Sequence, residues 1–157
     1  MTPEQVALVE RSLAAARPQL RELAADFYAR LFHAHPELRS MFSGDPVAQQ
    51  EKLAAELDAI VSAIPSHAYF LERARDLGVR HARLGTTAPH YRMVGDALLE
   101  ALASASGPGW TDELAQAWAA AYALVAEVMM AGAADAAEDA QPAGGPDGAA
   151  PPAPRNA

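Results

Sequence analysis

The sequence has no cysteine, which excludes disulfides, thiolate metal sites and cysteine nucleophiles. It also has no excess of positive charge. Its formal net charge of −8 over 157 residues argues against nucleic acid or an anionic membrane as the main partner. No segment approaches the roughly 20 uninterrupted apolar residues that span a bilayer. The amino terminus lacks a basic region followed by an apolar run. We therefore expect a cytoplasmic protein with no membrane span.

The sequence also lacks any segment that alternates apolar and polar residues with a period of two, so no β-strand is predicted. Hydrophobic residues make up 51% of the chain, and many of them are alanine, which favours helix. A length of 157 residues suggests a single domain with a substantial core. These observations predict an all-α protein.

Proline and capping residues divide the chain into helices. Thr2 and Gln5 form a capping box around Pro3, and Asp45 precedes Pro46 as a cap. Further helices are expected to begin at Pro18, at Pro36, after the break at 65–66, after the turn at 85–89, and at Thr111. These signals predict six long helices and a short one over residues 36–42.

The carboxyl end of the chain differs in composition from the rest. From Gln141 onward the residues are mainly proline, glycine and alanine, which cannot bury a core. We therefore predict a folded domain over residues 1–136 and a disordered tail over residues 137–157.

A histidine occupies an otherwise apolar helical stripe. The stripe repeats at helical spacing and consists of Phe70, Ala74, Leu77, His81 and Leu84. One interpretation is a core histidine with an ordinary hydrogen-bond partner. The other is haem ligation, in which a neutral imidazole donates its Nε2 lone pair to iron. In that case Arg80 and Arg83 could meet the anionic haem propionates.

Separated motifs along the chain support the second interpretation. They are residues 26–32, residues 36–42, residues 49–53, His81, residues 91–95 and residues 118–122. In this order and at these spacings they resemble bacterial globins, in particular single-domain bacterial haemoglobins and the haem domain of flavohaemoglobins. The resemblance covers about residues 1–136. It implies a globin fold that holds haem b, which is iron protoporphyrin IX.

The resemblance assigns roles on the proximal side of the haem. It implies that His81 is the iron ligand and that Arg80 and Val94 contact the haem. Tyr91 matches the tyrosine that helps tie this histidine to a carboxylate of the last helix. The family has glutamate there, whereas the matching position here is Asp135, with Glu138 as the alternative. Such a carboxylate would strengthen the imidazole as a donor.

On the distal side, the resemblance makes Tyr28 and Gln49 the pair that faces the bound gas. Dioxygen bound to haem iron gains negative charge, and a phenol and a primary amide can both donate to it. Phe42 matches the phenylalanine that packs against the haem face. Leu53, one turn after Gln49, would line the distal pocket, although it could equally be an ordinary core residue.

The implied function is reversible dioxygen binding, with nitric oxide dioxygenation as an activity that we leave open. In flavohaemoglobins a fused flavin domain reduces the iron again after each reaction. No such domain is expected within these residues, so the dioxygenation would need a separate NAD(P)H-dependent reductase. An oxygen sensor and a haem-free interaction module that act through a partner protein are the alternatives. A homodimer is also compatible with the sequence.

Overall fold

The computed structural model describes residues 1–141, and within that range it is all-α, as predicted. The six long helices are α1 (Pro3–Ala16), α2 (Leu20–Ala34), α3 (Pro46–Ala63), α4 (His67–Arg83), α5 (Ala88–Ser106) and α6 (Asp112–Asp139). Three short 3₁₀ segments lie between them: η1 (Arg17–Gln19), η2 (Pro36–Met41) and η3 (Gly107–Gly109). The short helix predicted after Pro36 is η2. The helix expected at Pro18 begins at Leu20, because Pro18 lies within η1.

The predicted caps hold the helix starts. Thr2 and Gln5 form the capping box of α1. Asp45 accepts a hydrogen bond from the Ala48 backbone, and Thr111 accepts one from Leu114. Each cap satisfies an amide that has no partner within its helix.

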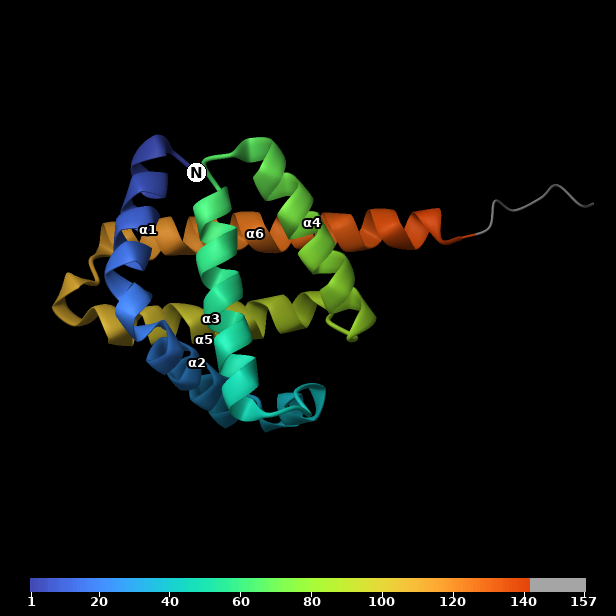
Figure 1. Ribbon diagram of the computed structural model, residues 1–157, viewed down its shortest axis with the longest axis horizontal. Helices are drawn as coiled ribbons and strands as arrows, with labels where there is room; N and C mark the ends of the chain where they lie inside the picture. The colour runs from blue at the N-terminus through green and yellow to red at the C-terminus, as the bar shows by residue number, and fades with distance from the viewer. Residues whose placement is uncertain (142–157) are drawn as a thin grey trace, which may run out of the picture.

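The helices form two crossing layers around one core. In Figure 1, α1, α3 and α4 cross over α5 and α6, which run side by side behind them. The most extensive helix pairs are α4 with α6 and α2 with α5. The largest fully buried side chains come from α1, α2, α4, α5 and α6: Trp118, Phe70, Leu13, Leu31, Leu102 and Val9. This core fixes α4, which carries His81, against α6.

Two glycines let α4 and α6 come into backbone contact. A Cβ at Gly78 would lie 1.9 Å from the Met129 carbonyl oxygen, and a Cβ at Gly132 would lie 2.7 Å from the Arg75 Cα. Any side chain at either position would therefore force the helices apart. This contact between α4 and α6 was not predicted from the sequence.

Helix α6 is the longest helix in the described range, with 28 residues. By length and composition it is apolar enough to cross a membrane, and 33% of its most apolar window is buried. It packs against α1, α4 and α5 within the described residues, and one such helix is weak evidence for a membrane span. Residues 137–139 of the predicted tail belong to α6. Residues 142–157 lie outside the described range.

One member of the stripe around His81 was assigned wrongly. Phe70, Ala74 and Leu77 are buried, as predicted. Leu84, however, is 72% exposed. The reason is that α4 ends at Arg83, so Leu84 is the C-cap and no longer follows the helical stripe.

Candidate functional site

The structure brings Tyr28 and Gln49 into contact. The Gln49 amide Nε2 donates a hydrogen bond of 3.0 Å to the Tyr28 hydroxyl oxygen. Tyr28 is on α2 and only 8% exposed, whereas Gln49 is half-buried in the first turn of α3. Since the oxygen of Tyr28 accepts this bond, its own O–H hydrogen stays free to donate to another group.

Burial keeps the Tyr28 hydroxyl protonated. It raises the pKa of Tyr28 above the ordinary value of 10.0, and the hydrogen bond from Gln49 only partly opposes this effect. At neutral pH the side chain is therefore a neutral hydrogen-bond donor in an apolar setting.

Aromatic rings surround the Tyr28 side chain. Phe42, which follows η2, lies 5.4 Å from the Tyr28 ring in an edge-on arrangement, and Phe32 lies 5.7 Å away in a stacked one. The Arg39 guanidinium lies over the Phe32 ring, 5.0 Å from its centroid. Leu53 is half-buried and packs against the core. The cluster forms an apolar wall beside a single polar pair.

On α4, one ring nitrogen of His81 is already engaged. Its Nδ1 lies 2.9 Å from the Leu77 carbonyl oxygen. A carbonyl can only accept, so Nδ1 carries the hydrogen and the neutral imidazole keeps its lone pair on Nε2. His81 is half-buried near the end of α4. This tautomer suits metal ligation through Nε2, with the second nitrogen fixed by a backbone partner.

Tyr91 and Val94 lie on the first turns of α5 and pack, half-buried, against the core. Tyr122 of α6 donates a hydrogen bond to the Tyr91 backbone carbonyl. Burial raises the pKa of Tyr91 and also that of Tyr122, so both phenols stay neutral. Sequence reasoning did not find the role of Tyr122, although its ring also fills the space beside Gly95.

The structure does not bring Asp135 to His81. An Asp135 carboxylate oxygen pairs instead with the Arg75 guanidinium at 3.0 Å, and its side chain is 56% exposed. Within residues 1–141, neither Asp135 nor Glu138 is hydrogen-bonded to His81 or Tyr91. The role proposed for Asp135 behind His81 therefore stays a prediction, and the partner seen at Nδ1 is the Leu77 carbonyl.

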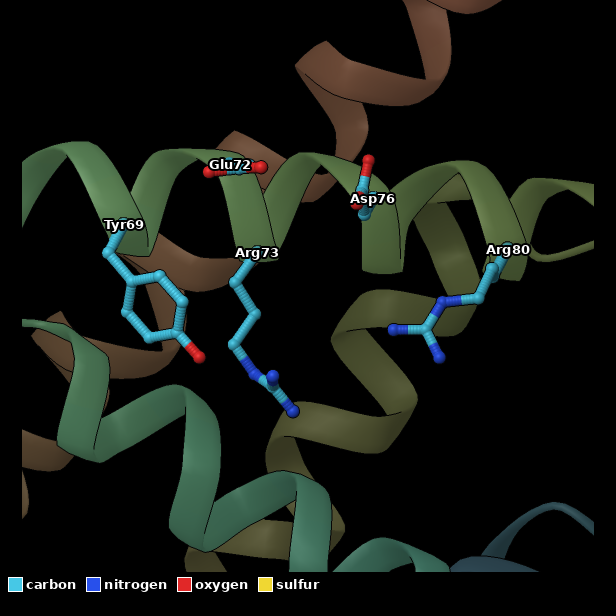
Figure 2. A pocket seen from close by; sticks show the side chains of 5 residues that line it. All are labelled: Tyr69, Glu72, Arg73, Asp76 and Arg80. Carbon is cyan, nitrogen blue, oxygen red and sulfur yellow. The ribbon is translucent and has the colours of Figure 1, made fainter.

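Arg80 belongs to an ionic group between α3 and α4. Glu56 of α3 lies 3.0 Å from Arg73 and 4.0 Å from Arg80. Figure 2 shows that both arginines extend to one side of α4, whereas Asp76 points to the other. A cavity of about 160 Å³ is lined by Tyr69, Glu72, Arg73, Asp76 and Arg80. The buried Arg73 Nε has no hydrogen-bond partner in the described part of the chain. Sequence reasoning missed Glu56, which lies two turns beyond Gln49 on the same face of α3.

Comparisons with known proteins identify the family of this chain. The Globin family model matches residues 25–129. The flavohemoprotein of Bordetella pertussis is 33% identical over 133 residues, which cover 83% of this chain and 33% of the relative. The flavohemoprotein of Deinococcus radiodurans is 36% identical over 138 residues, with the same coverages of 83% and 33%. The chain thus spans about a third of the length of these curated relatives.

Two solved structures share the architecture. One is an engineered carbene transferase from Rhodothermus marinus, provisionally described as a nitric oxide dioxygenase. It superposes with a TM-score of 0.79 at 30% identity, covering 88% of this chain and 97% of that one. The other is a hexacoordinated haem protein from a tardigrade, with a TM-score of 0.77 at 14% identity, covering 85% and 96%. The second likeness shows the fold alone. Together, the family match and the related sequences show that this chain belongs to the globin family.

Proposed function

We propose that this globin holds haem b between the Tyr28–Gln49 pair and His81 and binds dioxygen reversibly. The observation that carries the proposal is the 2.9 Å contact between His81 Nδ1 and the Leu77 carbonyl oxygen, which requires the hydrogen on Nδ1 and leaves the Nε2 lone pair available. Haem would supply the iron that binds the gas. Phe42 would pack on the porphyrin, and Arg80 would meet a propionate if it released Glu56.

The distal residues support selective stabilisation of a polar ligand. Tyr28 has a free hydroxyl hydrogen in a ring of apolar side chains, and Gln49 holds its oxygen in place. A hydrogen bond to a charged acceptor contributes about 1.5–3 kcal/mol. A gas that becomes negatively polarised on binding would gain this energy, whereas carbon monoxide would gain less.

The proximal residues favour binding over activation of dioxygen. A backbone carbonyl at Nδ1 is a weaker acceptor than a carboxylate, so the imidazole stays a moderate donor. A carboxylate there would push electron density toward the iron and favour cleavage of the bound ligand. The pairing of Asp135 with Arg75 supports the weaker arrangement.

Absorption spectroscopy of the full chain tests the proposal. We expect the purified protein reconstituted with haem to give the spectrum of a histidine-ligated haem. That spectrum should convert between reduced, oxygenated and carbon-monoxide forms. The absence of a Soret band after haem addition would refute it. A spectrum that did not change with oxygen would leave a haem protein without this function.

A second candidate function is nitric oxide dioxygenation with an external reductase. It is favoured by the likeness to flavohemoproteins over 83% of the chain. It is also favoured by the likeness to the Rhodothermus marinus protein that is provisionally described as a nitric oxide dioxygenase. Nitric oxide, dioxygen and one electron combine to nitrate, so each turnover needs an electron from outside this domain. Rapid NADH-driven consumption of nitric oxide with an added reductase would support it. Clean oxygen binding without such turnover would favour carriage alone.

A further inference from the structure

The ring of Phe32 lies beside both aromatic residues of the distal side, although no role in the site has been assigned to it. Its centroid is 5.7 Å from that of Tyr28, with the two ring planes 28° apart. It is also 5.5 Å from the centroid of Phe42, at 64°. Tyr28 and Phe42 are themselves 5.4 Å apart. The three rings therefore form a triangle in which each ring is packed against the other two.

The helical spacing of Tyr28 and Phe32 explains why these two rings stack. They are four residues apart on α2, which places them about one turn apart on the same face of the helix. Tyr28 is 8% exposed, whereas Phe32 is half-buried. Phe32 is therefore the more superficial of the two stacked rings, near the end of α2.

The position of the Tyr28 hydroxyl depends on how its ring leans. The hydroxyl oxygen lies on the χ2 axis, so rotation of the ring about that axis leaves it in place and only a change in χ1 moves it. Phe27 and Phe42 are steeply inclined to the Tyr28 ring, at 70° and 71°, whereas Phe32 is the nearly parallel neighbour. A nearly parallel ring opposes motion perpendicular to the tyrosine ring. Phe32 therefore restrains the lean of Tyr28 in a direction that the inclined rings restrain less directly.

A surface arginine restrains Phe32 in turn. Arg39 is an exposed residue of η2, and its guanidinium lies over the Phe32 ring at 5.0 Å from the centroid. A cation over the face of an aromatic ring is attracted by the negative charge of that face. The contact joins η2, which leads to Phe42, to the end of α2.

We propose that Phe32 is a positioning residue for the distal hydrogen bond, which holds the Tyr28 hydroxyl beside Gln49 in the orientation that donates to bound dioxygen. Arg39 holds Phe32 in this place from the surface. The inference rests on the function proposed above, in which Tyr28 is the donor. Phe32 acts through Tyr28, so its effect should be large for a gas that accepts a hydrogen bond and small for one that does not.

The test measures the dissociation of dioxygen and of carbon monoxide from the haem-loaded full chain by stopped-flow mixing. Phe32→Leu keeps an apolar side chain but lacks the flat ring that stacks on Tyr28. We expect dioxygen dissociation to become about three- to tenfold faster, a part of the full effect of losing a charged hydrogen bond. Carbon monoxide dissociation should change less. Arg39→Met, which keeps a long side chain without the charge, should speed dioxygen dissociation about twofold.

A double-mutant cycle tests whether Phe32 acts through the Tyr28 hydroxyl. In the Tyr28→Phe background that hydroxyl is absent, so adding Phe32→Leu should leave the rate of dioxygen dissociation unchanged. An acceleration of the same size in both backgrounds would show that Phe32 is only a packing residue, and it would overturn the inference.

The matched control is Phe70→Leu, the same substitution at a buried phenylalanine of α4. It should lower the unfolding free energy but change the two dissociation rates by the same factor. A crystal structure of Phe32→Leu gives an independent measurement. It should show the Tyr28 ring leaning from its place and the 3.0 Å hydrogen bond from Gln49 lengthened.

Two further outcomes separate this inference from the proposed function. A normal oxygenated spectrum, with wild-type rates in Phe32→Leu and an unmoved Tyr28, would overturn the role of Phe32 alone. A chain that bound no haem would refute the proposed function together with this inference.

Discussion

The two sides of the candidate haem site hold their key residue in different ways. On the distal side, side chains hold Tyr28: Gln49 donates to its oxygen at 3.0 Å, and aromatic rings enclose it. On the proximal side, backbone atoms hold His81. The Leu77 carbonyl oxygen lies beside its Nδ1, and at Gly78 the backbone of α4 contacts that of α6. A single substitution can alter the side chains around Tyr28 directly, whereas the Leu77 carbonyl is present whatever the side chain at that position. We therefore expect evolution and engineering to tune this protein from the distal side.

The largest effect is expected from removing the proximal ligand. His81→Gly should abolish the spectrum of a histidine-ligated haem, because the variant lacks the imidazole proposed to bind the iron. Added imidazole should restore the spectrum by filling the space that the side chain leaves. Absorption spectroscopy measures both results. His33→Gly, an exposed position on α2, is the control. An unchanged spectrum in His81→Gly would show that the iron ligand is another residue.

The next effect concerns the backbone contact behind His81. Gly78→Ala would place a Cβ within 1.9 Å of the Met129 carbonyl oxygen, so α4 and α6 must separate. We expect a loss of about 3 kcal/mol of unfolding free energy, in the range of severe overpacking. Urea denaturation measures it. Gly44→Ala, where a Cβ meets nothing within 4 Å, should change stability little. Equal stabilities would contradict the close approach.

On the distal side, Tyr28→Phe should speed oxygen dissociation by about tenfold to a hundredfold. This range follows from losing a charged hydrogen bond of about 1.5–3 kcal/mol. Carbon monoxide dissociation should change less, because that ligand gains little charge. Flash photolysis and stopped-flow mixing measure the two rates. Tyr69→Phe, at an exposed tyrosine of α4, is the matched control. Equal acceleration for both gases would indicate a steric effect instead.

A small effect is expected from Asp135→Asn. The variant loses the ion pair with Arg75, which is exposed and contributes about 0–1 kcal/mol. The iron–histidine stretching frequency, measured by resonance Raman spectroscopy on the reduced protein, should stay at its wild-type value. A clear fall in that frequency would restore Asp135 to the role behind His81. This measurement therefore tests directly whether the backbone carbonyl of Leu77 is the partner of the His81 Nδ1.

The smallest effect concerns pH. Burial raises the pKa of Tyr28 above 10.0, so the folded protein favours the neutral phenol. The contribution of the neutral Tyr28 phenol to the unfolding free energy is fully present below pH 10 and is lost as the pH rises through the raised pKa. Ultraviolet difference absorption should show a late tyrosine ionisation that Tyr28→Phe reduces in amplitude. Oxygen dissociation should stay constant up to about pH 10. Ionisation of Tyr28 at its ordinary pH would contradict the buried position.

Most of the fold could be predicted from short-range signals in the sequence. Caps such as Thr2, Asp45 and Thr111 act within four residues, so the sequence alone reveals them. The contact between Tyr28 and Gln49 was anticipated because the resemblance placed both in one pocket. The partner of Asp135 was not, since Arg75 and His81 lie on the same helix and the crossing of α4 with α6 decides which one it meets. Glu56 was missed because its pairing with Arg73 depends on the same kind of tertiary detail.

The glycine contact between α4 and α6 has a mechanical consequence. Where two backbones are in contact, there are no side chains between them that could repack, so the two helices cannot shift independently at this point. His81 lies less than one turn beyond Gly78, in the last turn of α4. The position of the imidazole can therefore change little unless the two helices separate, so this contact makes the proximal side of the candidate site rigid.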